Sequence, residues 1–324
     1  MKRKAHFQRT LASQASFEKY GRKSKRELFL DEMNVLVPWS QLLALVEPYY
    51  PKAGNGRQPV GLSIMLRIYF VQQWFNLSDP GMEEALYESA VLRRFVGVDL
   101  GLAPAPDETT ILRFRHLLEQ HDLGGAMLDT VNHYLDAQGI RITTGTIVDA
   151  TIIDAPWSTK NASGERDPEM HQTRKGNQWY FGLKAHIGVD SQAGIVHSVC
   201  TTAASVADMH MLPDLLHGEE RKVWGDGGYQ GQGAAIREAA PHAQDMTCRR
   251  TKFKDYVDEQ ARRKNTTKSK VRAKVEHPFR ILKRIFGFDK VRYRGLRKNH
   301  NRLCACFALV NLYQHRQRLV PQGA

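Results

Sequence analysis

The first half of the chain places apolar residues at spacings of three and four, the period of helices that bury one face. This pattern runs from Glu27 to Gly139, with a turn-rich break at 51–59 and a capping residue, Asp107, before one helical segment. We therefore predict an all-helical unit of about five helices over residues 27–139. The preceding residues 1–26 are polar and basic, and we predict a flexible arm there.

From Ile140 onward the pattern changes to short apolar runs that are rich in β-branched residues and separated by turns. Strands are predicted at 144–156, 179–190, 193–204, 222–231 (ending in a glycine turn) and 244–250. Helices are predicted at 207–217, 233–240, 271–286 and 301–316, and irregular segments at 157–178 and 251–270. RNase H-like nucleases have this order of elements, so residues 140–324 are predicted to form a mixed α/β domain of that kind.

Charge is concentrated toward the C-terminal end. Residues 249–302 hold 20 lysines and arginines against five acidic residues, a net charge of +15 that exceeds the +13 of the whole chain. Such a block is either a solvated surface or a face that binds a polyanion. Glu276 lies inside the block. A purely electrostatic surface has no use for that acid, so a nucleic-acid site with its own chemistry is favoured.

Cysteine spacing and hydropathy narrow the class of protein further, because they argue against a zinc site and a membrane span. The four cysteines lack the spacing of zinc ligands, and we expect buried free thiols. No apolar run reaches the roughly 18 residues of a membrane span, and no apolar segment follows the basic N-terminus as in a signal peptide. We therefore expect a cytoplasmic protein without a membrane partner.

Three carboxylates indicate chemistry on a phosphate backbone. Asp149 lies within a predicted strand, Asp226 ends another strand before a glycine turn, and Glu276 lies on the predicted helix 271–286. Adjacent strands can bring the two aspartates together, and a helix packed on the sheet can add the glutamate. Three such oxygen ligands suit two Mg²⁺ ions about 3.5–4 Å apart, the arrangement used for phosphodiester cleavage.

The position of Glu276 around its helix agrees with this interpretation. At about 100° per residue, Glu276 and Lys283 fall within about 40° of Arg272. The three lie on one ridge beside the apolar stripe of the helix, whereas a solvated face would be expected to scatter them. From this ridge an acid can reach a metal ion on the sheet while two cations reach phosphates.

Each carboxylate also has a structural interpretation. The aspartates could form turns, and Glu276 could pair with a neighbouring arginine on its helix. Asp154 competes with Asp149 in the same strand, and it ranks second because the strand ends at Pro156. Asp190 is predicted to be a turn residue and Asp208 a helix cap. His186 and His277 are predicted to pack or to form hydrogen bonds rather than to bind a metal ion.

Between Glu27 and Tyr313 the chain resembles bacterial insertion-sequence transposases of the DDE class, in the group named for insertion sequence five. Seven segments carry the resemblance: EPYYPKAGNGRQP, NLSDPGMEEALYE, TTILRFRHLLEQH, VDATIIDAP, DPEMHQTRKGNQWYFGLKAHIGVD, GDGGYQG and RAKVEHPFRILKRIFGF. The family signature around the glutamate has an arginine four residues before it and a lysine seven after it, as here. The wider superfamily begins that signature with a tyrosine, where this chain has Ser269.

The resemblance implies an RNase H-like catalytic domain and places the catalytic, metal-binding triad on Asp149, Asp226 and Glu276. It implies two Mg²⁺ ions, which Mn²⁺ can replace, and double-stranded DNA as the partner. Such enzymes bind the terminal inverted repeats of their element, cut the ends and join the 3′ ends to target DNA. Because two ends must be paired, we expect a homodimer on DNA, associated with the bacterial nucleoid.

Basic side chains are the candidate DNA contacts. In the C-terminal block these are Arg272, Arg280, Lys283, Lys252, Lys254, Arg262, Arg263 and Lys264. In the helical unit, which would bind the element ends, they are Arg93, Arg94, Arg113 and Arg115. Two other functions stay open from the sequence: a domesticated, non-catalytic DNA-binding protein, and a nuclease of the same fold that acts on another nucleic acid.

Overall fold

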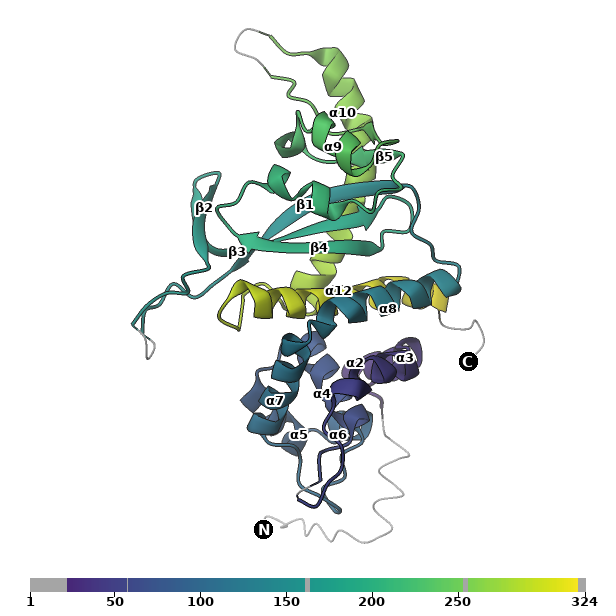
Figure 1. The fold of residues 1–324 in the computed structure, drawn as a ribbon, viewed down its shortest axis with the longest axis vertical. Coiled ribbons are helices and arrows are strands. Elements are labelled where there is room, and N and C mark those ends of the chain that lie inside the picture. Colours follow the sequence, from purple (N-terminus) through teal and green to yellow (C-terminus); the bar gives the residue numbers. More distant parts are fainter. Residues whose placement is uncertain (1–21, 57, 161–163, 253–255, 320–324) are drawn as a thin grey trace, which may run out of the picture.

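The computed structural model describes residues 22–56, 58–160, 164–252 and 256–319. Helices form one half of the molecule and a sheet dominates the other (Figure 1). Helices α8 (Leu123–Ala137) and α12 (Leu296–Leu319) lie side by side between the two halves. The predicted order, a helical region followed by a mixed α/β region, is confirmed.

The helical half is built from short amphipathic helices. They are α2 (Lys25–Leu36), α3 (Trp39–Val46), the 3₁₀ turn η1 (Glu47–Tyr49), α4 (Leu62–Phe75), α5 (Asp79–Glu88), α6 (Ala90–Val96) and α7 (Glu108–Gln120). Asp107 caps α7 through the Thr110 N–H, as its position predicted, and Ser24 caps α2 in the same way. Helix α2 therefore begins inside the predicted arm, of which residues 1–21 lie outside the described residues.

The sheet is mixed and has β1 at its centre. Its strands are β1 (Gly145–Asp154), β2 (His171–Lys175), β3 (Gln178–Asp190), β4 (Val196–Ala203), β5 (Lys222–Trp224) and β6 (Gln244–Asp245). Their order is β2-β3-β1-β5-β6, and β4 also pairs with β3. Strand β1 runs antiparallel to β3 and parallel to β5. The carboxyl ends of β1 and β5 therefore point the same way, which matters for the site.

Several predicted elements are wrong in detail. The predicted loop 157–178 contains β2, the predicted strand 244–250 shrinks to β6, and the predicted irregular segment 251–270 contains most of α10 (Glu259–Arg272). The predicted helix 207–217 is two 3₁₀ turns, η2 (Asp208–Met211) and η3 (Pro213–Leu215). Asp208 is the first residue of η2 and makes no cap; it forms an ion pair with Lys184 at 2.8 Å.

The predicted helix 271–286 is helical but irregular. The end of α10 passes into a 3₁₀ turn η5 (Ala273–Val275), then α11 (Glu276–Arg280) and a π-helical turn η6 (Ile281–Ile285). Pro278 accounts for the tightened turn before it, because proline has no N–H and its ring clashes with the carbonyl four residues earlier. Glu276 therefore begins a new turn at a change in helical pitch.

The two faces of the sheet pack against different layers. Ile147 and Ile153 of β1 belong to the large core shared with α8 and α12, whereas Val148 packs in a smaller core with Tyr229. Because side chains alternate along a strand, Asp149 shares the face of Ile147 and Ile153. The 3₁₀ turn η4 (Gly227–Tyr229) and helix α9 (Gly233–Ala239) cover the other face. No described helix has the length and apolarity that crossing a membrane requires.

A partly buried polar joint connects the two halves. Asn76, in the left-handed conformation (φ 50°) after α4, donates to the Gly287 carbonyl at 2.6 Å. Its side-chain oxygen accepts from Arg292 and Arg302, each at 3.0 Å. Arg115 of α7 stacks on Tyr293, with 3.9 Å between guanidinium carbon and ring centre. The helical half is thus bonded to the segment that directly follows the helix carrying Glu276.

Candidate active site

The three predicted carboxylates line one pocket of about 640 Å³. Asp149 lies in the middle of β1, and Ile147 of β1 pairs with Trp224 of β5 in parallel register. Asp226 follows Trp224 by two residues, as Asp149 follows Ile147, so the two aspartates are neighbours across the strands. Asp226 also caps η4 by accepting from the Gly228 N–H at 2.8 Å. Glu276, at the start of α11, adds the third carboxylate from a different layer.

Electrostatics shows that the carboxylates act on one another. The pKa of Asp149 is raised from 3.8 to about 6, mainly because burial penalises its charge. The Ala150 N–H and the Arg272 guanidinium oppose the rise, and the negative charges of Asp226 and Glu276 add to it. Arg272 lies 3.3 Å from the Asp149 carboxylate in an ion pair. Burial of Asp149 is therefore the main cause of the raised pKa, and the two neighbouring carboxylates add to it.

The donor set suits a hard divalent cation. Three carboxylates supply the oxygen ligands that Mg²⁺ prefers, and their mutual repulsion is what such a cation would relieve. Across the described parts of the chain, no three acidic, histidine or cysteine side chains are drawn together tightly enough to form a finished metal cluster. The carboxylates thus share a pocket without closing around a common point.

Basic side chains form much of the rest of the pocket wall. Arg272, Arg280 and Lys283, all predicted from the sequence, line it. Lys283 donates to the Ile152 carbonyl at 2.6 Å, and burial lowers its pKa. The helix was predicted as regular, yet the three ridge residues, Arg272, Glu276 and Lys283, still line this pocket: its 3₁₀ turn overwinds and its π turn underwinds the chain.

The surroundings of Asp154, the competing acid on β1, indicate a role in the fold rather than in the site. Its backbone pairs with the turn after η6: its N–H donates to the Asp289 carbonyl at 3.1 Å, and its carbonyl accepts from Val291 at 2.8 Å. The side chain does not line the pocket. Burial raises the pKa of this carboxyl, while nearby Lys283 and Lys290 oppose the rise. The geometry therefore favours Asp149 as the strand's site residue.

Three pocket residues were missed by sequence reasoning. Lys175, at the end of β2, and Arg284, in η6, line the pocket together with His277. His277 is exposed and lines the pocket rather than packing in a core, whereas buried His186 bonds to Thr202 at 2.8 Å as expected. The Gly176–Asn177 turn signal could have identified the hairpin that carries Lys175. Strand β2 itself is exposed, so its sequence shows no alternation of apolar and polar residues that would have predicted it.

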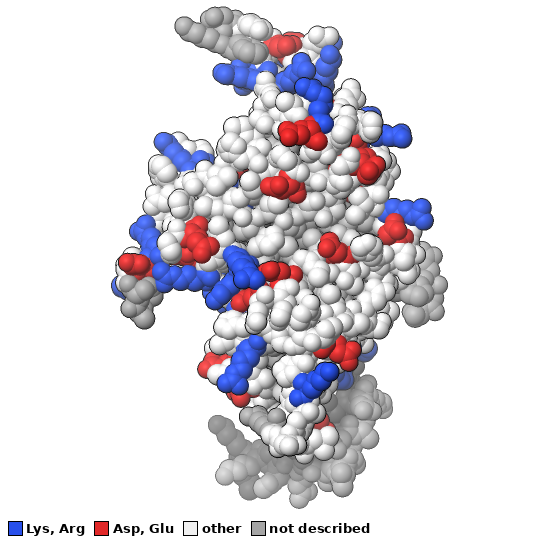
Figure 2. All heavy atoms as spheres, viewed as in Figure 1, with Lys and Arg blue, Asp and Glu red and all other residues white. Residues whose placement is uncertain are grey.

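The remaining C-terminal candidates lie away from this pocket. Arg262, Arg263 and Lys264 are exposed on α10, a helix with no buried residue, and Arg262 pairs with Glu259 at 3.2 Å. Lys252 is also exposed, and Lys254 lies outside the described residues. Figure 2 shows lysine and arginine side chains gathered at the end of the molecule where α10 projects. The basic block is therefore divided between a pocket and a separate surface.

The arginines of the helical half differ in environment. Arg115 is 6% exposed and pairs with Asp79 at 2.9 Å and Glu119 at 2.6 Å, so its prediction as a phosphate contact is wrong. Arg93 donates to the carbonyls of Leu86 and Tyr87, which close the preceding helix. By contrast, Arg94 is largely exposed beside Glu27, and Arg113 is exposed on α7.

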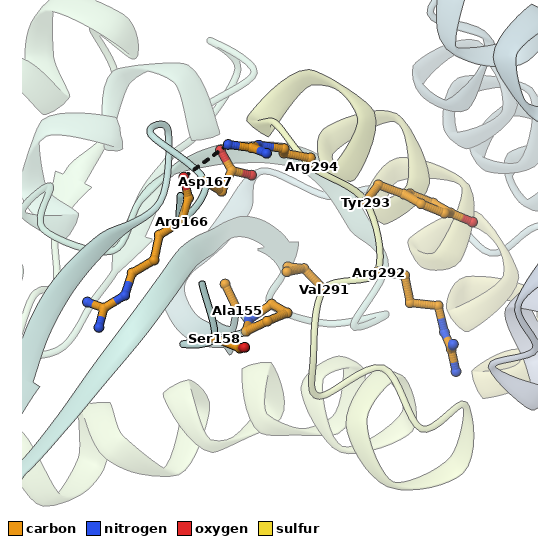
Figure 3. Close-up of a pocket in the computed structure, with 9 residues that line it drawn as sticks. Ala155, Ser158, Arg166, Asp167, Val291, Arg292, Tyr293 and Arg294 are labelled. Atoms are coloured by element: carbon orange, nitrogen blue, oxygen red, sulfur yellow. Dashed lines mark hydrogen bonds between the residues drawn. The ribbon is translucent and has the colours of Figure 1, made fainter. Parts of the chain in front are cut away.

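A second, smaller pocket of about 150 Å³ lies where the loop after β1 meets the segment 291–294 (Figure 3). Arg294 donates to the Arg166 carbonyl at 3.1 Å, the contact dashed in Figure 3. Asp167 accepts from the Gly295 N–H and Glu169 from the Leu296 N–H, each at 2.7 Å, so the loop caps the start of α12. The predicted site residues do not line this pocket, which marks a structural junction.

Two family models match the chain. A family model described as a transposase DDE domain matches residues 141–312, more than half of the chain. A second model, described as a transposase domain (DUF772), matches residues 18–117. No solved structure matches the chain significantly.

The α/β domain is thus of the RNase H-like kind found in DDE recombination enzymes, preceded by a helical region. The chain belongs to the DDE transposase family.

Proposed function

We propose that this chain is an insertion-sequence transposase of the group named for insertion sequence five. It binds the terminal inverted repeats of its element, cleaves the ends and joins the 3′ ends to target DNA. The observation that carries the proposal is the shared pocket: carboxylates from two neighbouring strands and a helix, walled by lysine and arginine. Because two ends must be brought together, the enzyme acts as a homodimer on DNA.

In this proposal Asp149, Asp226 and Glu276 hold the divalent ions, normally Mg²⁺, with Mn²⁺ as a substitute. When bound, a pair of such ions activates the attacking oxygen and stabilises the leaving oxygen of the phosphodiester. The burial of Asp149 on β1 and the capping bond of Asp226 hold these ligands on rigid elements before DNA arrives. Both attacks, by water and then by a 3′ hydroxyl, take place at this site.

The basic residues position the DNA. Arg272 balances Asp149, and Arg280 and Lys283 face the same pocket, where they contact backbone phosphates next to the cut. Residues 27–139 bind the element ends, and the catalytic domain spans 140–324. The exposed residues Lys252, Arg262, Arg263 and Lys264, together with Lys254, contact DNA outside the pocket.

The test uses the purified protein, Mg²⁺ and DNA that carries the inverted repeats flanking its gene. Asp149→Asn, Asp226→Asn and Glu276→Gln should each reduce end cleavage by about a thousandfold or more, because each removes a metal ligand. End binding should persist, since phosphate contacts supply most of the affinity. An Asp226→Asn protein that nicks the ends at the wild-type rate would disprove the assignment. Equal cleavage of DNA without the repeats would favour a general nuclease.

A further inference from the structure

The hairpin of β2 and β3 presents two different faces beside the candidate site. Gly176, with φ +62°, and Asn177 form its turn, and Lys175 pairs with Gln178 while Arg174 pairs with Trp179. Residues that pair directly across two strands point to the same face. Lys175 and Arg174 are therefore adjacent basic residues on opposite faces, and of the two Lys175 alone lines the pocket.

Lys175 faces a wall of like charge. Arg280, Lys283 and Arg284 line the pocket from α11 and η6, while Lys175 comes from the hairpin. The charge of Lys175 reaches Lys283, where it contributes to lowering the pKa of that ammonium. With Arg272, five cations line the pocket against three carboxylates.

The cations of the pocket differ in how they are held. Arg272 is engaged by Asp149, and Lys283 donates to the Ile152 carbonyl. Arg174, on the other face of the hairpin, donates to the Gly176 carbonyl at 3.1 Å and to Asn177 at 3.3 Å. The ammonium of Lys175 has neither a hydrogen bond nor an ion pair with any residue that the structure describes. An unpaired ammonium near other cations is expected where an anion binds.

We propose that Lys175 is a positioning residue that binds one phosphate of the strand being cut, beside the scissile phosphate. The strand then lies between the β2–β3 hairpin and helix α11, held from both sides over the three carboxylates. This inference rests on the proposed function, because it takes end cleavage as the reaction. It assigns the hairpin a role in setting where the backbone lies during attack.

The first experiment compares Lys175→Ala with Arg174→Ala, a matched removal of one charge from the same hairpin. In single-turnover cleavage at saturating DNA, Lys175→Ala should be slower by about tenfold to a hundredfold, because a misplaced phosphate is attacked poorly. The dissociation constant for end DNA should change by no more than about threefold, since Lys175 is one contact among many. Arg174→Ala should stay within about twofold of wild type, and Lys175→Arg should recover most of the rate.

A second measurement separates positioning from a structural role. End DNAs carrying one neutral methylphosphonate at successive positions around the cut should show one position where the wild type slows and Lys175→Ala does not slow further. Wild-type cleavage by Lys175→Ala, or equal sensitivity of both proteins at every position, would overturn the inference. If Asp226→Asn is inactive in the same assay, only Lys175 is misassigned; if the wild type cleaves no ends, the proposed function fails.

Discussion

Arginines of the joint between the two halves and arginines of the candidate site share a chemistry but not an environment. Arg115 and Arg302 of the joint are almost fully buried and are bonded to side chains distant in sequence. Arg272 in the pocket has a single carboxylate partner, and Arg280 is exposed. The number of protein partners thus separates cations that stabilise the fold from cations available to a polyanion.

The largest effect expected from this difference is the loss of stability when Arg115 is removed. Arg115→Ala should lower the free energy of unfolding by about 3–5 kcal/mol, because Asp79 and Glu119 would be left as poorly paired, largely buried carboxylates. Arg113→Ala, an exposed arginine on the same helix, should change it by less than about 0.5 kcal/mol. Urea unfolding monitored by circular dichroism measures both. Equal stability of the two variants would show that the joint contributes nothing.

A smaller effect is expected from Asp149→Asn in the absence of metal. The folded-state pKa of about 6 lies above the ordinary 3.8, so the folded protein binds the extra proton between these values. The native Asp149 charge therefore costs stability in full above about pH 6, and this cost disappears as the pH falls toward 4. Asp149→Asn should stabilise the protein at pH 7.5 by about 1–3 kcal/mol.

Thermal or urea unfolding across pH 4 to pH 8 checks the sign of this effect. The gain from Asp149→Asn should shrink steadily as the pH is lowered, and saturating Mg²⁺ should reverse the order by stabilising only the wild type. A gain that is constant with pH would mean that packing, rather than the buried charge, distinguishes the two proteins.

The smallest effect concerns α10, whose basic surface lies outside both the joint and the candidate site. The double change Arg263→Ala and Lys264→Ala should leave stability within about 0.5 kcal/mol, because this helix buries no side chain. The slope of log affinity for end DNA against log salt concentration should become shallower by about one to two, one for each phosphate that the variant no longer neutralises. An unchanged slope would place α10 outside the DNA interface.

Much of the site could be predicted because its geometry follows from local rules. Strand period and the parallel pairing of β1 with β5 place Asp149 beside Asp226, and a helical ridge brings Glu276 close to Arg272 and Lys283. The apolar patterns of the strands and the helix are visible in the sequence, whereas the parallel pairing of β1 with β5 comes from the structure. The ridge of Arg272, Glu276 and Lys283 is kept despite the 3₁₀ and π turns, because these two distortions change the helical pitch in opposite senses.

The errors arise where an element buries little or where partners are distant. Helix α10 has no apolar stripe and β2 is exposed on both faces, so neither leaves a periodic signal. Lys175 was missed for that reason. Arg115 is wrongly predicted as a phosphate contact because two of its partners, Asp79 and Tyr293, are far from it in sequence.

The bonds of Asn76 have a consequence for the proposed action of the two halves on DNA. One side chain fastens the end of α4 to both Gly287 and Arg292, immediately after the helix of Glu276. If the helical half binds the repeat, these bonds hold it at a fixed distance from the catalytic pocket. The cut should then fall a constant number of base pairs from the recognised sequence, and adding a base pair between them should move the cut away from the element's end.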